Sequence, residues 1–174
     1  MGNCFGKSTT QRRHDNWKAT GIVALRDGGV RSIPSNLLAI AGSVRTLDLS
    51  NNSISDLAQE DLQGSLQELD VSNNQLSSLP AALGSLSKLK VLQADTNSIA
   101  AVPGQLLQGC SALHTLSLHS NPITPAELEG TPGYTEYDAR RRGKYDKVLA
   151  GGALLGSAGL DDGLDRLLKA PSPN

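Results

Sequence analysis

Residues 66–80 read LQELDVSNNQLSSLP, and the same order of apolar and asparagine positions returns in three other stretches of the chain. These stretches are VRTLDLSNNSISDL at 44–57, LKVLQADTNSIAAVP at 89–103 and LHTLSLHSNPITPA at 113–126. All four fit the template L-x-x-L-x-L-x-x-N-x-L-x-x-L without gaps, and their starts lie 22, 23 and 24 residues apart. A more divergent copy, TGIVALRDGGVRSIP, begins at Thr20 and has Gly28 in the asparagine position. Repetition at a period of roughly 20–30 residues is typical of proteins built from stacked coils.

The apolar positions of this template are filled almost without exception. Of the 25 such positions in the five copies, 24 hold Val, Ile, Leu or Ala, although apolar residues make up only 38% of the chain. Within each copy the L-x-L segment, for example Leu47 and Leu49, predicts a short strand that buries alternate residues. The edge of one such strand needs hydrogen-bond partners, which the next coil supplies. The sequence therefore predicts an α/β solenoid of about five coils with a short parallel sheet on its concave side.

Four of the copies place an asparagine after the strand, at Asn52, Asn74, Asn97 and Asn121. The chain must turn inward at this point while its backbone is buried. We expect the side-chain amides to hydrogen-bond to backbone groups that the turn would otherwise leave unpaired.

Both ends of a solenoid need a cap, because the first and last coils otherwise expose apolar surface. Residues 8–19 can form a short helix or arm that places Trp17 over the first copy. At the other end, the sequence from Thr124 to Glu127 has the pattern of a capping box and predicts the start of a helix. The expected organisation is an acylated arm and N-terminal cap at 1–19, the solenoid at 20–124, a C-terminal helical cap at 125–149 and a flexible tail at 150–174.

A run of basic residues lies within the expected C-terminal cap. It comprises Arg140, Arg141, Arg142, Lys144 and Lys147. We interpret it as a solvated helix face that is partly paired with Glu136, Asp138 and Asp146, and a functional role for the run is the alternative.

Composition excludes several classes of protein. The formal net charge of -1 provides no overall field that would attract nucleic acid. No stretch approaches the ~18 consecutive apolar residues of a membrane-spanning helix, and the N-terminus lacks the apolar region of a secretory signal. Of the two cysteines, Cys4 lies in a terminal arm, so a disulfide to Cys110 is not expected and a reducing, intracellular setting fits better.

The sequence offers no pattern typical of catalysis or of cofactor binding. The glycines of GGALLGSAGL at 151–160 do not follow a strand, and no phosphate-binding lysine follows them. His114 and His119 are expected on opposite faces of one strand, without acidic or cysteine ligands nearby in sequence. Cys110 fits a buried, small apolar side chain. We therefore expect no enzymatic activity, no cofactor and no metal.

Several stretches within and outside the repeats resemble a known family. They are TGIVALRD, SVRTLDLSNN, SLHSNPIT, YDARRRGKYDK and GSAGLDDGLD, at 20–27, 43–52, 117–124, 137–147 and 156–165. In these stretches the chain resembles the small intracellular leucine-rich-repeat proteins of plants and animals, especially the plant type. The resemblance implies a curved solenoid that binds proteins on its concave face and has no catalytic residues. It also implies relatives with more coils than this chain has.

The recognition face follows from strand geometry. In each copy the third, fifth and seventh template positions are expected to point out of the concave sheet. The candidate partner-binding residues among them are Arg26, Asp48, Glu68, Asp70, Gln93, Asp95, Ser117 and His119. Four of these are acidic, which predicts a partner segment that is basic or rich in hydrogen-bond donors. The alternative is that they are ordinary solvated carboxylates.

The first residues of the chain suggest attachment to a membrane. Removal of Met1 would expose Gly2 for N-myristoylation, although Gly6 stands where the usual pattern has Ser or Thr. One myristoyl chain holds a protein only weakly, and Cys4 could supply a second anchor by palmitoylation. The nearby basic residues Lys7, Arg12, Arg13 and Lys18 would face an anionic leaflet. An ordinary N-terminal arm is the alternative.

Two functional classes follow from these observations. The first is a membrane-tethered adaptor or scaffold in intracellular signalling, located on the cytoplasmic face of a membrane or otherwise in the cytoplasm. The second is a soluble structural subunit of a larger protein assembly. In both cases we expect a monomer that binds a protein and no nucleic acid, and fold alone does not decide between the two.

Overall fold

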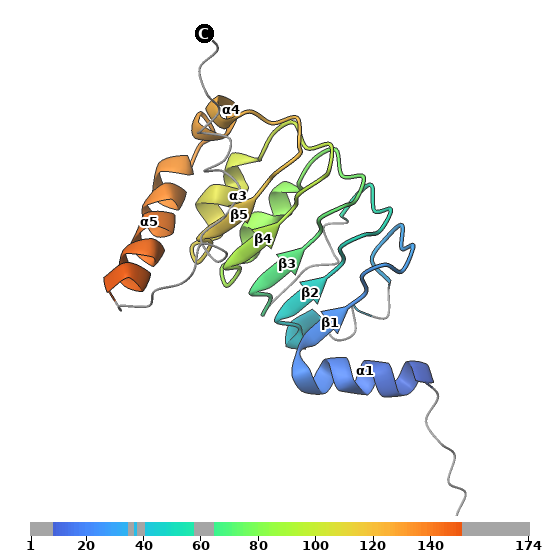
Figure 1. Ribbon diagram of the computed structural model, residues 1–174. Helices are drawn as coiled ribbons and strands as arrows, with labels where there is room; N and C mark the ends of the chain where they lie inside the picture. Colours follow the sequence, from blue (N-terminus) through green and yellow to red (C-terminus); the bar gives the residue numbers. More distant parts are fainter. Residues whose placement is uncertain (1–8, 35–36, 38–40, 58–64, 151–174) are drawn as a thin grey trace, which may run out of the picture.

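The computed structural model describes residues 9–34, 37, 41–57 and 65–150 of the chain. Its centre is one sheet of five parallel strands in the order β1-β2-β3-β4-β5, so consecutive coils lie side by side (Figure 1). The strands are β1 Ile22–Ala24, β2 Thr46–Asp48, β3 Glu68–Asp70, β4 Val91–Gln93 and β5 Thr115–Ser117. The predicted solenoid with a short parallel sheet is confirmed.

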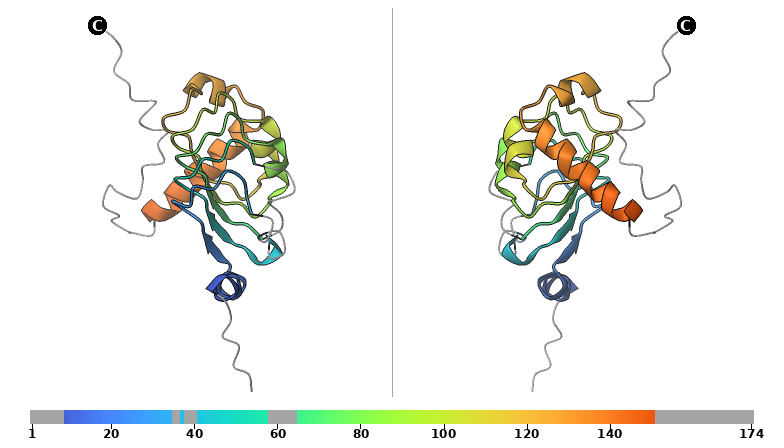
Figure 2. Two further views of the ribbon diagram at one scale, coloured as in Figure 1. Left: turned by 90° about the vertical axis from the view of Figure 1, so that its right-hand side faces the viewer. Right: turned by 90° about the vertical axis from the view of Figure 1, so that its left-hand side faces the viewer.

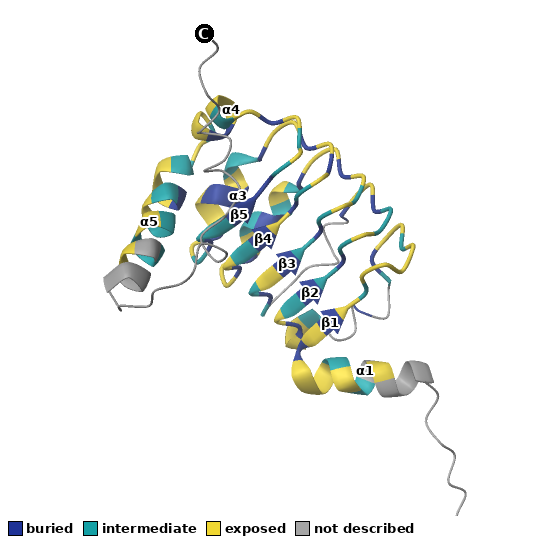
Figure 3. Cartoon of the chain, viewed as in Figure 1, coloured by how far each residue is buried: buried dark blue, intermediate teal, exposed yellow. Residues whose placement is uncertain are grey.

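Strand register follows the repeat template. Leu47, Leu69 and Leu92 pair directly across β2, β3 and β4, and all three are buried. In each strand the middle residue is buried, while the two flanking residues are exposed or half-buried except at Ser117. Figure 3 shows this alternation as a row of buried positions along the sheet. The core is therefore a stack of leucine, isoleucine and valine layers, one layer for each coil.

The asparagines form a ladder between coils. The amide of Asn97 donates to the carbonyl oxygens of Val71, Ala94 and Asp95, and its oxygen accepts from the N–H of Leu76. Val71 and Leu76 belong to the preceding coil, so the side chain connects two coils. Asn52, Asn74 and Asn121 make the equivalent connections. The expected role of the asparagines is confirmed, and the structure adds that much of the bonding runs between coils.

Short helical segments line the other side of the sheet. They are η1 Ala41–Ser43, η2 Ala81–Ser85 and α3 Gly104–Gly109. The backbones of η2 and α3 touch, because a Cβ atom on Gly109 would overlap the carbonyl oxygen of Gly84. A Cβ atom on Gly84 would likewise overlap the carbonyl oxygen of Gln105. Glycine is therefore the residue that permits this close approach.

Helix α1, Thr9–Thr20, covers the start of the solenoid (Figure 1). Trp17 is half-buried and packs against the core, in agreement with the expectation from sequence. The chain leaves the helix through Gly21, whose N–H donates to the carbonyl oxygen of Trp17. Gly21 has a φ of 71°, a conformation that favours glycine. This turn directs the chain from α1 into β1.

Helices α4, Pro125–Glu129, and α5, Tyr134–Ala150, close the other end. Thr124 and Glu127 form the expected capping box, with both reciprocal hydrogen bonds present. Figure 2 shows α5 lying across the end of the solenoid. Tyr137 is 1% exposed, and its hydroxyl oxygen accepts from the N–H of Leu116 at the open edge of β5. The predicted C-terminal helical cap is confirmed.

Arg140 differs from the expected solvated helix face. Its guanidinium is half-buried and donates to the carbonyl oxygens of Leu113, at 3.0 Å, and Leu107, at 2.9 Å. It thereby ties α5 to the backbone of the last two coils. Asp138 pairs with Arg141 and Arg142 as expected. The basic run is thus divided between a cap contact and surface ion pairs.

Several residues singled out from the sequence lie outside the described part of the structure. They are Gly2, Cys4, Lys7 and the tail from residue 151 onward. Among the residues that are described, no helix is both long enough and apolar enough to cross a membrane.

Candidate functional site

The concave face has a shallow hollow at its centre, over β2, β3 and β4. Its volume is about 190 Å³. The hollow is lined by Thr46, Leu47, Asp48, Glu68, Leu69, Asp70, Val91 and Gln93. The structure therefore brings together four of the predicted recognition residues, namely Asp48, Glu68, Asp70 and Gln93. No lysine or arginine is among the lining residues.

Local sequence fixes the two aspartates in place. The Oδ1 atom of Asp48 accepts from the N–H of Ser50 at 3.0 Å and from its hydroxyl at 2.6 Å. The Oδ1 atom of Asp70 accepts from the N–H of Ser72 at 2.9 Å. These Asp-x-Ser turns orient the carboxylates and use one oxygen of each. The second oxygen of each carboxylate is available to a partner.

Three carboxylates, those of Asp48, Glu68 and Asp70, line the hollow. Asp48 and Asp70 are paired directly across β2 and β3, and Glu68 accepts from the hydroxyl of Thr46 at 3.3 Å. Within the described residues, the ion pairs of the structure involve Asp138 and none of these three groups. Like charges on neighbouring strands repel each other. A positively charged group entering the hollow would relieve that repulsion.

The remaining predicted recognition residues are placed differently. Asp95 accepts from the hydroxyl of Ser117 at 2.6 Å and from the N–H of His119 at 2.7 Å, so it joins the fourth coil to the fifth. Ser117 is 7% exposed and offers a partner little surface, which corrects the expectation that it points into solvent. Arg26 is exposed beyond the end of β1, and neither it nor His119 lines the hollow. The acidic centre is thus smaller than the sequence suggested.

One side chain near the sheet was not among the predicted recognition residues. Lys144 of α5 donates to the hydroxyl of Thr115 at 2.8 Å and so reaches the edge of the concave face at β5. The sequence places Lys144 in a basic run. Only the packing of α5 against the last coil shows that this lysine reaches the sheet.

The structure provides no arrangement typical of a reactive centre in the part of the chain that it describes. No three His, Cys, Asp or Glu side chains there lie together as a metal site would require. Cys110 is fully buried, its thiol donates to the carbonyl oxygen of Leu83, and burial raises the pKa of the thiol to about 11. A thiol with such a pKa remains protonated and unreactive near neutral pH. The interpretation of Cys110 as a buried apolar side chain is confirmed.

Comparison with known families agrees with this architecture. The leucine rich repeat family model matches residues 42–99 and 64–123, which contain β2 to β5. The chain is a leucine-rich-repeat protein. Curved solenoids of stacked repeats are protein-interaction modules with extended concave surfaces.

The leucine-rich-repeat chain is similar to curated plant proteins whose names describe them as intracellular. It is 28% identical to plant intracellular Ras-group-related LRR protein 7 of Oryza sativa, in an alignment of 260 residues that takes in 95% of this chain and 99% of the relative. It is 44% identical to plant intracellular Ras-group-related LRR protein 8 of the same species over 48 residues, which are 28% of this chain and 13% of that protein. The first alignment is longer than this chain, so that relative contains additional residues, on the order of four coils of ordinary length.

Solved structures support the same fold. An LRR protein of Leptospira interrogans has a TM-score of 0.51 and 35% identity, over 56% of this chain and 25% of that one. The BIR2 ectodomain of Arabidopsis thaliana has a TM-score of 0.50 and 30% identity, over 58% of this chain and 55% of that one. The leucine-rich-repeat chain thus spans about a quarter to a half of the length of these structures, and the similarity concerns the solenoid.

Proposed function

We propose that this chain is a non-catalytic adaptor that binds a basic protein segment in its concave hollow while its N-terminus is held at a membrane. The observation that carries the first part is that three carboxylates, those of Asp48, Glu68 and Asp70, line the hollow, whereas no lysine or arginine is among its lining residues. An arginine or lysine of a partner would find acceptor oxygens on neighbouring strands, which lie ~4.8 Å apart. A guanidinium can engage two such acceptors at once.

A peptide-binding experiment tests the hollow. The full chain is screened against short random peptides, and the bound pool should be enriched in arginine and lysine. The variant Asp48→Asn/Asp70→Asn should weaken that binding about tenfold or more, because it removes two charges from the site. Asparagine retains the Oδ1 acceptor, so the bonds to Ser50 and Ser72 are preserved and folding should be unaffected.

A control variant with the same change in net charge distinguishes the loss of the two hollow carboxylates from a general effect of lower negative charge on peptide binding. Asp56 and Glu136 are exposed and lie outside the hollow. Asp56→Asn/Glu136→Gln should leave peptide binding within about twofold of wild type. Equal losses in the two double variants, or a bound pool with no basic preference, would contradict the assignment of the hollow as the binding site.

The membrane part of the proposal depends on Gly2 and Cys4. Their positions in the sequence support myristoylation followed by palmitoylation, and Lys7, Arg12, Arg13 and Lys18 would add attraction to an anionic leaflet. With a fluorescent tag at the C-terminus, the wild-type chain should lie on membranes. Gly2→Ala should become cytosolic, and Cys4→Ser should be held only weakly. The two variants also serve as controls for each other, since only Gly2→Ala removes the first acyl chain.

A second candidate function is a soluble structural subunit of a larger assembly. It is favoured by the relatives whose names describe intracellular proteins without reference to a membrane. A tagged wild-type chain that remained in the soluble fraction, and sedimented as part of a large complex, would support this candidate over the tethered adaptor. In either case we propose that the chain has no enzymatic activity and is a monomer before it meets its partner.

A further inference from the structure

A row of side chains lies at the edge of the sheet where each strand begins. The residues that precede β2, β3, β4 and β5 are Arg45, Gln67, Lys90 and His114. Their backbones are bonded in sequence from coil to coil: Gln67 N–H donates to Arg45, Lys90 N–H donates to Gln67, and His114 N–H donates to Lys90. The row therefore has the spacing of adjacent strands. We call the segments that contain it, residues 42–45, 65–67, 85–90 and 109–114, the strand-start rim.

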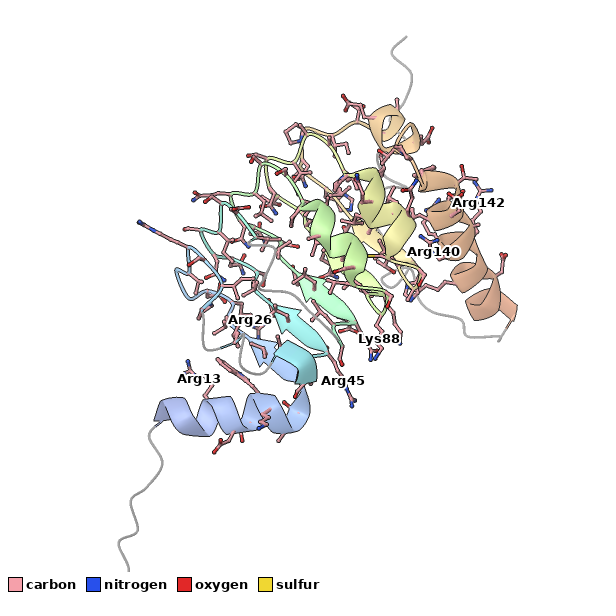
Figure 4. The ribbon with its side chains drawn as sticks, turned by 180° about the vertical axis from the view of Figure 1, so that it is seen from behind. Arg13, Arg26, Arg45, Lys88, Arg140 and Arg142 are labelled. Carbon is pink, nitrogen blue, oxygen red and sulfur yellow. The ribbon has the colours of Figure 1, made fainter. Side chains whose placement is uncertain are left out.

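The strand-start rim is basic. It contains Arg45, Lys88 and Lys90, and no aspartate or glutamate occurs in its four segments. All three basic side chains are exposed, and Figure 4 shows Arg45 and Lys88 projecting on the same side of the molecule. The ion pairs found within the described residues involve none of the three. Lys90 Nζ donates to Gln67 Oε1, at 3.0 Å.

The positive field continues to the end of the sheet. Burial lowers the pKa of His114, and the charges of Lys144 and Lys90 lower it further. Both lysines therefore lie close enough to His114 to act on its ring. Lys144 approaches from α5, so the cap extends the basic row by one more charge. At the other end the row begins beside Gly21, which joins it to α1 and to the exposed Lys18.

We propose that the strand-start rim binds the headgroups of an anionic phospholipid surface, so that this edge of the sheet faces the membrane. The proposal rests on the membrane attachment put forward above and adds an orientation to it. A second protein is the less suitable occupant, because protein interfaces depend on buried apolar or aromatic anchors. The large apolar residues of the rim, such as Leu66, Leu89 and Leu113, are buried in the core. Long, exposed cations without an exposed apolar anchor beside them suit a diffuse layer of phosphates instead.

The lipid anchor and the rim are compatible in distance. The seven residues from Gly2 to Thr9 span at most about 25 Å. Helix α1 has 12 residues and ends beside the rim, so its two ends lie about 18 Å apart. The reach of residues 2–9 thus exceeds the length of α1, so the N-terminus can extend back alongside the helix to the strand-start rim. The concave hollow lies on the face of the sheet and not on this edge, so a peptide could still enter it.

Vesicle binding by the full chain tests the proposal independently of acylation in cells. The chain is alkylated at Cys4 with myristyl maleimide, which is feasible because Cys110 is fully buried. One such alkyl chain gives marginal, reversible binding with a constant of about 10⁴ M⁻¹. The measured quantity is the ratio of the binding constants for phosphatidylserine-containing and neutral phosphatidylcholine vesicles. Each rim charge near an anionic leaflet should contribute about fivefold to this ratio.

The variant Arg45→Gln/Lys88→Gln/Lys90→Gln should lower the ratio at least about tenfold. The matched control is Arg26→Gln/Arg31→Gln/Arg142→Gln, which removes three exposed charges away from the rim and should keep the ratio within about threefold of wild type. Equal ratios for the two triple variants would overturn the proposal, as would a wild-type ratio near unity. Failure of Gly2→Ala to relocate in cells would refute only the native anchor, because the alkylated chain does not depend on it.

Discussion

Two asparagines of the ladder share one acceptor, and this makes their energetic coupling predictable. Asn74 and Asn97 both donate to the carbonyl oxygen of Val71, each at 3.0 Å. Replacing either asparagine with alanine leaves the Val71 carbonyl with one of these two donors. Each replacement also removes the side-chain oxygen that accepts from one backbone N–H, that of Ile54 for Asn74 and that of Leu76 for Asn97. One unpaired buried N–H costs about 1–3 kcal/mol, and with the weakened carbonyl bonds we expect about 2–4 kcal/mol for each single variant.

The double variant should cost more than the sum of the single variants. In Asn74→Ala/Asn97→Ala the Val71 carbonyl loses both donors, which should add about 1–2 kcal/mol to the summed loss of unfolding free energy. Asn52 provides the control, because it donates to Leu25, Leu49 and Ser50 and shares no acceptor with Asn97. Asn52→Ala/Asn97→Ala should therefore be additive within about 0.5 kcal/mol.

Urea unfolding followed by circular dichroism measures these free energies. Trimethylamine oxide, added to all variants, keeps the weakest of them folded at zero urea. Asn16, an exposed residue of α1, serves as a further control, and Asn16→Ala should change the free energy by less than about 0.5 kcal/mol. If the losses of unfolding free energy in Asn74→Ala and Asn97→Ala simply added up in the double variant, the predicted coupling would be refuted. Such a result would mean that the Val71 carbonyl does not need a hydrogen bond from either amide.

Three further predictions concern single residues. Thr96 has a φ of 52°, and asparagine occupies the equivalent position of two other coils, so Thr96→Asn should raise the free energy of unfolding by about 0.5–1 kcal/mol in the same urea assay. Tyr137→Phe removes the acceptor of the Leu116 N–H at the last strand and should lower the melting temperature, at a cost of about 1–3 kcal/mol, whereas an unchanged melting temperature would show that the cap needs no such bond. Burial raises the pKa of the Cys110 thiol from 9.0 to about 11, so the folded state favours the protonated thiol. The free energy of unfolding of the wild type should therefore be constant relative to that of Cys110→Ala below pH 9. It should fall relative to that variant as the pH rises from 9 toward 11. A constant difference between those two proteins across this range would contradict the burial of the thiol.

Sequence alone was sufficient for the parts of this molecule that depend on neighbouring residues or on the repeat. The buried positions of β2, β3 and β4 are template leucines, and the helix start at Thr124 is encoded within four residues. The orientation of Asp48 and Asp70 depends on a serine two positions further along the chain. Such features can be read from sequence because the interacting groups lie within one turn or at equivalent positions of successive coils.

The errors concern contacts between elements that are far apart in the sequence. Asp95 looks like a third concave aspartate, yet it lies one coil before the two groups that it holds, Ser117 and His119. Arg140 and Lys144 belong to a run that resembles a solvated surface, and only the packing of α5 shows that they reach backbone and side chains of the last coil. Neither local pattern nor repeat register contains this information, because the cap has no counterpart within the repeats.

The contact between Gly84 and Gly109 has a consequence for the size of the arc that the solenoid describes. Hydrogen bonds hold the five strands at a fixed separation, so the radius of the arc depends on how far apart the backs of the coils stand. Touching backbones at η2 and α3 keep those backs close together and the arc wide. Alanine at either glycine would force the backs apart while the strands stayed in place, and the arc would tighten. The concave side chains of β3 and β4, Asp70 and Gln93 among them, would then tilt toward one another, so two glycines on the far side of the sheet set the width of that half of the hollow.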